Sequence, residues 1–242
     1  MHGIDSAGPP PRRATVAAAA RTPLRVAIVG AESTGKSVLA HALANALTHE
    51  FGLRCAVVDE WLRTWCEREG RTPRADEQID IAREHARRIE VAATQPGLDL
   101  LLCDTTPLMV AVYSELLFDD RSLEPVANAC QERMDLTLLT ALDLPWVADG
   151  IMRDGPHVRE PVDRAVRARL MGCNVAWSVV SGDGTARTAR ALDALQPLLA
   201  QWCARHATSG GLFSSLLGGG IGPPRPPLAP CLRCDPPPVG QI

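Results

Sequence analysis

Short apolar runs alternate along the chain with longer segments in which apolar residues recur at helical spacing. Polar or turn-forming residues bound the runs, which cover residues 24–29, 55–58, 100–103, 136–142 and 176–180. A short continuous apolar run is typical of a strand that is buried on both faces, as the strands of parallel sheets are. The pattern therefore predicts a mainly parallel sheet of five strands.

The segments between the runs carry helical periodicity. The stripe that follows the first run consists of Leu39, Leu43, Leu47 and Phe51. An Arg- and Glu-rich helix is predicted over 75–93, with an inward face of Ile79, Ala82, Ala86 and Ile89. Further helices are expected near 107–118, 123–133, 160–172 and 185–206. Amphipathic helices that alternate with buried strands predict a three-layer α/β domain.

The two ends of the chain differ in composition from the segment between them. Residues 1–23 are rich in Pro, Ala and Arg without periodicity, and residues 207–242 are dense in Gly and Pro. Segments of this kind bury too little apolar surface to fold by themselves. We therefore expect a disordered N-terminal tail at 1–23, one domain at 24–206 and a disordered C-terminal tail at 207–242.

The loop after the first apolar run reads GAESTGKS and spans residues 30–37. It matches the pattern GxxxxGK[ST], which is specific when it joins a buried strand to an amphipathic helix, as here. Its glycines let the backbone curl so that successive N–H groups point into one concavity, where the helix N-terminus adds its positive dipole end. The pattern predicts a P-loop NTPase fold with a phosphate cradle made of Gly30, Glu32, Ser33, Thr34 and Gly35.

Lys36 is the only lysine among the 25 basic residues of the chain. Elsewhere the sequence uses arginine, so a compact and mobile ammonium group is kept at this one position inside the loop. We expect Lys36 to reach the β- and γ-phosphates of ATP and the hydroxyl of Ser37 to ligate Mg²⁺.

A bound ATP–Mg²⁺ needs a second metal ligand at the end of a neighbouring strand. The apolar run at 100–103 is followed by Asp104, and ligands of open α/β sheets bind at the carboxyl ends of the strands. Asp104 is thus the candidate partner of Ser37 at the metal. The alternative is that Asp104 caps the helix that begins near Pro107.

Asp59 and Glu60 follow the second apolar run, where a kinase needs a carboxylate to orient or deprotonate the acceptor hydroxyl. Glu60 is the preferred base and Asp59 the second choice. Arg63 lies one helical turn further and either binds phosphate, holds Glu60, or forms a solvated ion pair with it.

The segment after the fourth run has the Asp, Gly and Pro content of a loop that leads into a helix. Its arginines, Arg153, Arg159 and Arg164, are candidates to close over the phosphates, and the alternative is an exposed linker in which they pair with nearby carboxylates.

Tryptophans lie in the sequence beside these polar positions, and they either stack on a substrate ring or belong to the core. They are Trp61, Trp65 and Trp146.

The stretches GAESTGKS, DEWLRTW, LLLCDTTP and WVADGIMRDG, in this order and at these spacings, resemble the nicotinamide riboside kinase domain of NadR-type proteins and the small P-loop ATPase/kinase proteins grouped with it. The resemblance covers roughly residues 24–200. It implies ATP–Mg²⁺ binding at the loop, an acidic contribution from Glu60 and Asp104, a lid from Trp146 to Arg153, and phosphate transfer to a riboside hydroxyl in NAD metabolism. By the same resemblance, SGDGTART at 181–188 borders the adenine.

Two departures from the resembled family are visible. The bifunctional members carry an N-terminal adenylyltransferase domain with an HxGH signature, and we do not expect that second activity here. Riboside-binding members commonly have an aromatic residue before the glutamate that follows the second strand, whereas this chain has Asp59. A pyridine ring would lose one stacking face at this position.

Net charge and cysteine content limit the classes of binding partner and the cellular compartment that we expect. The formal net charge of −3 gives no general attraction to nucleic acid or to anionic membranes. Eight cysteines lie mostly in apolar segments, which favours a reducing cytoplasm, and neither a secretory signal nor a membrane span is recognisable. Cys203, His206, Cys231 and Cys234 offer four potential zinc ligands, but reduced cysteines in a low-complexity tail are the preferred interpretation.

The sequence thus favours an ATP-dependent small-molecule kinase that acts on a riboside such as nicotinamide riboside. The alternative is an ATP-binding regulatory switch without a small-molecule acceptor. A polynucleotide kinase is disfavoured because no basic stripe with interleaved aromatic residues is present. The oligomeric state is not indicated.

Overall fold

The computed structural model describes residues 22–147 and 155–206. Several predicted features lie outside the described residues: most of the N-terminal tail, Arg153, and the C-terminal tail with Cys231 and Cys234. What the sequence predicts for these residues is not tested by the structure.

The described residues form one sheet in the order β2-β3-β1-β4-β5, and every pair of neighbouring strands is parallel. The central strand is β1, in which Ala27 lies between Cys103 and Thr137 of its two neighbours. Together these features confirm the predicted five-stranded parallel sheet. The strands are β1 (Leu24–Val29), β2 (Cys55–Val58), β3 (Leu100–Asp104), β4 (Leu136–Thr140) and β5 (Trp177–Val180).

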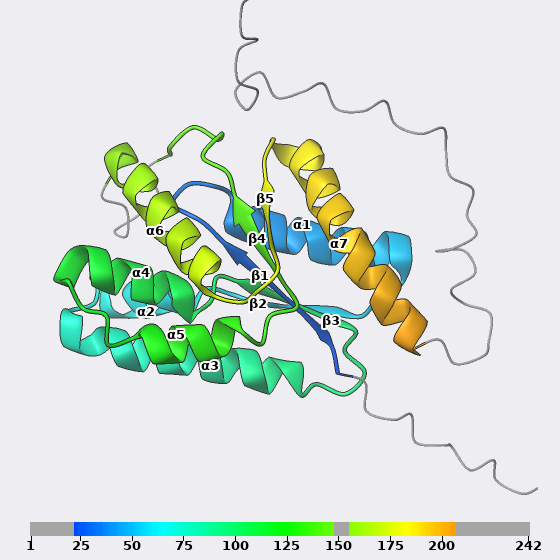
Figure 1. Ribbon diagram of the computed structural model, residues 1–242, viewed down its shortest axis with the longest axis horizontal. Helices are drawn as coiled ribbons and strands as arrows, with labels where there is room; N and C mark the ends of the chain where they lie inside the picture. Colours follow the sequence, from blue (N-terminus) through cyan, green and yellow to red (C-terminus); the bar gives the residue numbers. More distant parts are fainter. Residues whose placement is uncertain (1–21, 148–154, 207–242) are drawn as a thin grey trace, which may run out of the picture. The chain divides into compact units, whose positions relative to one another are not determined.

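Helices cover both faces of the sheet, which confirms the three-layer α/β prediction (Figure 1). One face carries α1 (Lys36–Phe51) and α7 (Gly184–His206), and the other carries α3 (Gln78–Ala93), α4 (Pro107–Phe118), α5 (Glu124–Gln131) and α6 (Arg159–Gly172). The ranges predicted for α3 to α7 were accurate to within a few residues, and α1 carries the predicted stripe. A further helix, α2 (Trp61–Glu69), has no counterpart among the predicted ranges, and the turns η1 (Ala75–Glu77) and η3 (Pro156–Val158) precede α3 and α6.

The inward face of α3 differs from the prediction. Its buried residues are Gln78, Ile81, Ala82, His85, Ile89 and Ala93, while Ile79 and Ala86 are only partly buried. The helix is therefore rotated relative to the face that its most apolar residues define. This rotation brings two polar side chains, Gln78 and His85, into the interior.

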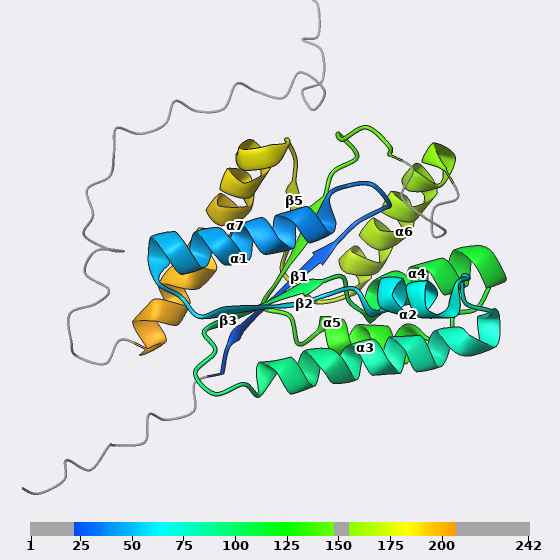
Figure 2. The ribbon, with the colours of Figure 1, turned by 180° about the vertical axis from the view of Figure 1, so that it is seen from behind.

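Two hydrophobic clusters among the described residues are built by the helices α2 to α6. The larger one lies between the sheet and its helices and includes Val58, Ile89, Leu101, Met109 and Val166. The smaller one joins α2, α3, α4 and α5 and includes Leu62, Trp65, Ile81, Val110 and Ala127. Because α2 and α4 begin just after β2 and β3 end, this second cluster forms a helical lobe beyond the carboxyl ends of those strands (Figure 2).

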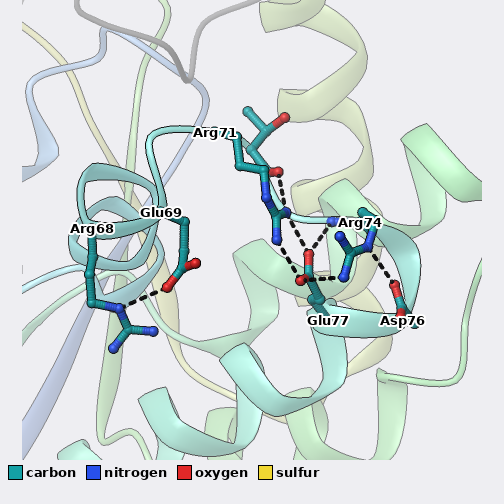
Figure 3. Close-up of polar contacts among 7 residues, drawn as sticks. Arg68, Glu69, Arg71, Arg74, Asp76 and Glu77 are labelled. Atoms are coloured by element: carbon teal, nitrogen blue, oxygen red, sulfur yellow. Dashed lines mark hydrogen bonds and ion pairs between the residues drawn. The ribbon is translucent and has the colours of Figure 1, made fainter.

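The turn between α2 and α3 is held by ion pairs. Gly70 ends α2 in a left-handed conformation, with φ of 68°. Arg71 and Arg74 then converge on the carboxylate of Glu77, at 2.7 and 2.8 Å, as Figure 3 shows. Glu77 also accepts a hydrogen bond from the backbone N–H of Arg74, which completes a capping box at the start of the helical segment.

Candidate active site

The glycines of the loop at 30–37 are required by geometry. Gly30 and Gly35 have φ of 147° and 75°, conformations that favour glycine. A Cβ atom on Gly30 would lie 2.2 Å from the hydroxyl oxygen of Thr140 at the end of β4. The loop therefore packs directly on β4, and only glycine fits at this contact.

A chain of hydrogen bonds fixes the loop from within. Thr140 donates to the hydroxyl of Thr34 at 2.7 Å, and Thr34 donates to the carbonyl oxygen of Ala31 at 2.8 Å. The ammonium group of Lys36 lies over the same carbonyl, at 2.8 Å. The shape of the loop is therefore held by hydrogen bonds within the protein itself.

The segment that follows β4, residues 141–147, wraps around the loop. Its Leu144 side chain packs against Gly35, 3.1 Å from where a Cβ would stand. Ser33 donates a hydrogen bond to the carbonyl oxygen of Val147 at 2.8 Å. Trp146, next to Val147, is half-buried, and its indole N–H has no hydrogen-bond partner among the described residues. Trp146 is therefore a neighbour of the residue that contacts the loop, and its substrate role stays a prediction.

Arg187, at the start of α7, braces the loop from the opposite side. Its guanidinium donates to the carbonyl oxygen of Thr34, to the carboxylate of Asp143, and to the carbonyl oxygen of Gly182 at 2.6 Å. Asp143 also accepts a hydrogen bond from the backbone N–H of Gly182. Arg187 is only 3% exposed and each of its three nitrogens donates a hydrogen bond within the protein, so it positions the loop.

Neither Arg187 nor Asp143 was predicted from the sequence to support the loop. Arg187 lies within the SGDGTART stretch that resembles an adenine-bordering segment, but no local pattern couples it to a residue 153 positions earlier. In the sequence, Asp143 belongs to a stretch that was interpreted as a polar loop.

Asp104 is the last residue of β3 and is almost fully buried, with 2% of its surface exposed. Burial raises the pKa of this carboxyl, while a hydrogen bond from Ser37 and the charges of Lys36 and Arg63 oppose the rise. One of its oxygens has no hydrogen-bond partner within the described part of the chain. The N-cap position of the helix that follows is Thr106, so Asp104 is not its N-cap.

This environment fits Mg²⁺. A hydroxyl and a buried carboxylate with an unused oxygen are hard oxygen ligands, and Mg²⁺ typically takes one or two carboxylates and completes its shell with phosphates and water. Ser37 and Asp104 are the residues that would hold the ion.

The two acidic residues after β2 have different surroundings. The side chain of Glu60 is 12% exposed and its carboxylate lies 4.0 Å from the guanidinium of Arg63. The side chain of Asp59 is 72% exposed and lies 3.2 Å from the imidazole of His41 on α1. Glu60 therefore has the shielded position that the preferred base needs, and Asp59 faces α1 and solvent.

Two of the predicted aromatic residues lie in a groove between α2 and α3, with a volume of about 460 Å³. The guanidinium of Arg88 covers the ring of Trp61 at 3.7 Å, and that of Arg71 lies 5.0 Å from the ring of Trp65. One face of each ring is thus already occupied by an arginine of the chain itself. Trp65 also belongs to the core of the helical lobe.

Arg159 is a second arginine near the loop, and unlike Arg187 it has nitrogens without any hydrogen-bond partner in the described part of the chain. Its Nη1 donates to the carbonyl oxygen of Leu144 at 2.9 Å, and the residue is 8% exposed. Its Nε and Nη2 have no hydrogen-bond partner in the described ranges. Leu144, which Arg159 contacts, is the residue after Asp143, so the guanidinium of Arg159 lies close to the contacts that brace the loop. A buried guanidinium with unused donors is suited to bind an anion.

A parallel α/β sheet with a strand–GAESTGKS–helix unit and a buried Asp104 at the neighbouring strand defines the class of P-loop nucleotide-binding proteins. The family comparison agrees, since residues 25–187 match the AAA domain family AAA_28. The chain belongs to this family. No curated protein sequence matches the chain.

Solved structures share the fold. NadR protein in complex with NAD and AMP-PNP is 20% identical with a TM-score of 0.59, and NadR protein in complex with NR is 17% identical with the same score. Each likeness covers 73% of this chain and 49% of the other, so the chain spans about half the length of those proteins. Thymidylate kinase from Ehrlichia chaffeensis is 14% identical with a TM-score of 0.52, covering 72% of this chain and all of that one. The predicted NadR-like P-loop kinase fold is thereby confirmed.

Within the described ranges, no helix has the length and apolarity needed to span a bilayer.

The six cysteines in the described part of the chain are free thiols, and burial raises the pKa of the Cys66 thiol to about 11.

Proposed function

We propose that the chain is an ATP-dependent small-molecule kinase that transfers the γ-phosphate to a hydroxyl of a riboside, nicotinamide riboside or a similar compound. The observation that carries the proposal is the pair of shielded carboxylates at adjacent strand ends, Asp104 beside Ser37 and Glu60 beside Arg63. A kinase needs two such groups with separate tasks, one at the metal and one at the acceptor.

The phosphate side of the proposed reaction uses the loop. Its backbone N–H groups and the positive end of α1 bind the polyphosphate, and Lys36 leaves the carbonyl of Ala31 to reach the β- and γ-phosphates. Mg²⁺, held by Ser37 and Asp104, would neutralise charge on the phosphate oxygens. Arg159 would contact the γ-phosphate with its unused donors, and Arg153 remains the second candidate for this contact.

On the acceptor side, Glu60 would orient the hydroxyl and accept its proton as the phosphate is transferred. Arg63, 4.0 Å away, would help to aim Glu60 at the acceptor. NadR protein has been solved with NR, which supports a riboside as the acceptor class for a chain of this fold. We propose a cytoplasmic location, with ATP and a small molecule as the ligands.

The test is an acceptor panel. Purified protein with ATP–Mg²⁺ is incubated with nicotinamide riboside and with common nucleosides, and new phosphomonoesters are measured. Glu60→Gln should lower the transfer rate about a hundredfold without weakening ATP binding, because general-base catalysis contributes on this order. The matched control is Asp59→Asn, which removes the neighbouring exposed carboxylate and should change the rate little.

ATP hydrolysis that proceeds unchanged with every acceptor, and that Glu60→Gln does not alter, would contradict the kinase proposal. It would favour the regulatory switch, in which water alone receives the phosphate.

A further inference from the structure

The turn that follows Asp104 contains a strained residue. Thr105 has a φ of 66°, and among the described residues it is the only β-branched one in the left-handed region. A β-branched side chain is a steric outlier there, and such outliers persist only where the surrounding structure holds them. Thr105 is 1% exposed, so the strain lies in the interior, directly beside the candidate metal ligand. Strained residues cluster at functional sites, which makes this turn a candidate for a role of its own.

The turn directs two side chains to opposite faces of the sheet. In a regular strand, residues two positions apart point to the same face. Asp104, however, accepts a hydrogen bond from Ser37 at the start of α1, whereas Thr106 donates to the side-chain oxygen of Gln131 in α5 at 2.8 Å. The helices α1 and α5 cover opposite faces (Figure 1). The left-handed conformation of Thr105 therefore allows Asp104 to face Ser37 while Thr106 is anchored on the other side.

Gln131, the last residue of α5, joins the turn to a neighbouring strand. Its side-chain oxygen accepts the hydrogen bond of Thr106, and its amide nitrogen donates to the hydroxyl of Thr137 in β4 at 2.5 Å. All three residues are fully buried. A buried polar network whose members are all bonded is rigid. Gln131 thus ties the end of β3 to β4 through side chains alone.

The strained residue is held from both sides. The backbone N–H of Thr105 donates to the carbonyl oxygen of Ile28 in β1 at 3.0 Å. On the other side, Thr106 occupies the N-cap position of α4, where a threonine hydroxyl commonly bonds the first turn of the helix. The Thr106 side chain makes no capping hydrogen bond and is bonded to Gln131 instead. Ile28 and Gln131 are therefore the two restraints that oppose relaxation of the turn.

Asp104 depends on this turn for its orientation. One carboxylate oxygen has no hydrogen-bond partner in the described part of the chain, so the side chain is positioned by the bond from Ser37 and by its own backbone. That backbone continues directly into Thr105. Residues that orient a metal ligand from outside the ligand shell typically change metal affinity by about 10–100-fold when they are replaced.

We propose that Gln131 is a positioning residue for the metal site: by tethering Thr106 it keeps Thr105 in the left-handed conformation, and so fixes Asp104 beside Ser37. The inference rests on the proposed function, since it concerns the residues that would hold Mg²⁺.

The experiment compares the affinity for ATP in calorimetric titrations with Mg²⁺ and in EDTA. Gln131→Leu should lower the affinity with Mg²⁺ by about three- to tenfold and leave that in EDTA within about twofold, because the carboxylate is displaced and the phosphate loop is not. Ser114→Ala is the matched control. It removes another buried hydrogen bond, from Ser114 of α4 to Asp120, so it should lower the melting temperature and leave both affinities unchanged.

A second substitution separates positioning from stability. Glycine adopts the left-handed conformation without a Cβ clash, so Thr105→Gly combined with Gln131→Leu should restore the affinity with Mg²⁺ to within about twofold of the wild type. Thr105→Ala in the same background keeps a Cβ and should restore less. Where Gln131→Leu does not fold, Thr106→Val removes the same hydrogen bond from the other side and should show the same loss and the same rescue.

Two results would overturn the positioning role. One is an affinity with Mg²⁺ that stays unchanged in the folded Gln131→Leu or Thr106→Val variant while the melting temperature falls, which is the behaviour of a purely structural network. The other is a loss of affinity that Thr105→Gly relieves no better than Thr105→Ala.

Because binding rather than phosphate transfer is measured, the two proposals fail separately. If the expected losses and rescue are seen but no acceptor is phosphorylated, the positioning role stands and the kinase proposal fails. If an acceptor is phosphorylated but the Gln131 variant binds ATP–Mg²⁺ like the wild type, the positioning role alone is overturned. A wild type whose affinity for ATP is the same with Mg²⁺ and in EDTA would overturn the positioning role as well.

Discussion

The hydroxyl of Thr140 donates a hydrogen bond of 2.7 Å to the hydroxyl of Thr34, and so ties the last residue of β4 to the middle of the phosphate loop. Both residues are fully buried. The same Thr140 oxygen closes the space beside Gly30. The loop therefore takes its shape from a strand that lies more than a hundred residues later in the chain.

Thr140→Val removes this donor while keeping the shape of the side chain. It should destabilise the protein by about 1–3 kcal/mol, because the buried hydroxyl of Thr34 loses its partner, and it should weaken ATP binding through a looser loop. Thr140→Ser keeps the hydroxyl and should lose much less. Chemical denaturation and calorimetric titration with ATP measure the two effects, and equal behaviour of the two variants would contradict the assigned role of the hydroxyl.

Asp104→Asn tests the metal ligand. The buried carboxylate lacks a protein partner on one oxygen, so its neutral analogue should fold with unchanged or greater stability. ATP binding in the presence of Mg²⁺ should weaken about tenfold or more, whereas binding of ATP in EDTA should stay the same. Titrations with and without Mg²⁺ check this difference. A loss of affinity that is equal in both conditions would point instead to a general role of the charge.

Arg187→Gln tests the brace on the loop. The change leaves the carboxylate of Asp143 and the carbonyl oxygen of Thr34 without their charged partner, in a site where Arg187 is nearly inaccessible. Losing hydrogen bonds to a charged group costs roughly 1.5–3 kcal/mol, and the lower end is expected here because the side chain of Asp143 is 35% exposed and water can replace its partner; the melting temperature and the affinity for ATP should fall together. Arg190→Gln, an exposed arginine of the same helix that bonds Ser181, is the control and should behave as the wild type.

Glu77 should make the turn between α2 and α3 sensitive to acid. The hydrogen bond from Arg71 and that from the backbone of Arg74 lower the pKa of Glu77 to about 2. A depressed pKa in the folded state means that the stabilisation is complete above the ordinary pKa, near 4.5, and is lost as the pH falls from there towards 2. Glu77→Gln should therefore be less stable than the wild type at neutral pH, and the difference should shrink over this range.

Urea denaturation at a series of pH values measures that difference. Glu67→Gln, which neutralises an exposed acid of α2, controls for the change in net charge. A difference between Glu77→Gln and the wild type that stays constant from pH 6 to pH 3 would be inconsistent with the ion pairs of this turn.

Local patterns were sufficient for much of the fold. The five apolar runs became the five strands, and the loop at 30–37 formed between the predicted strand and helix. Such features depend on residues close together in the chain, where periodicity and turn chemistry act directly. The inward face of α3 was predicted only in part: Ala82 and Ile89 are buried as expected, and Ile79 and Ala86 are partly buried against the clusters, while Gln78 and His85 are buried although hydrophobicity did not favour them.

The sequence by itself determined the phosphate loop, the alternation of strands and helices, and the acidic residues at the strand ends, because each is encoded in a short contiguous stretch. Only the tertiary structure decided the strand order, the different exposure of Asp59 and Glu60, the contact of Arg187 with Thr34 and the burial of His85. These features arise when segments that are distant in the sequence pack together. The contacts that stabilise them join residues far apart in the chain, so no local sequence pattern predicts them.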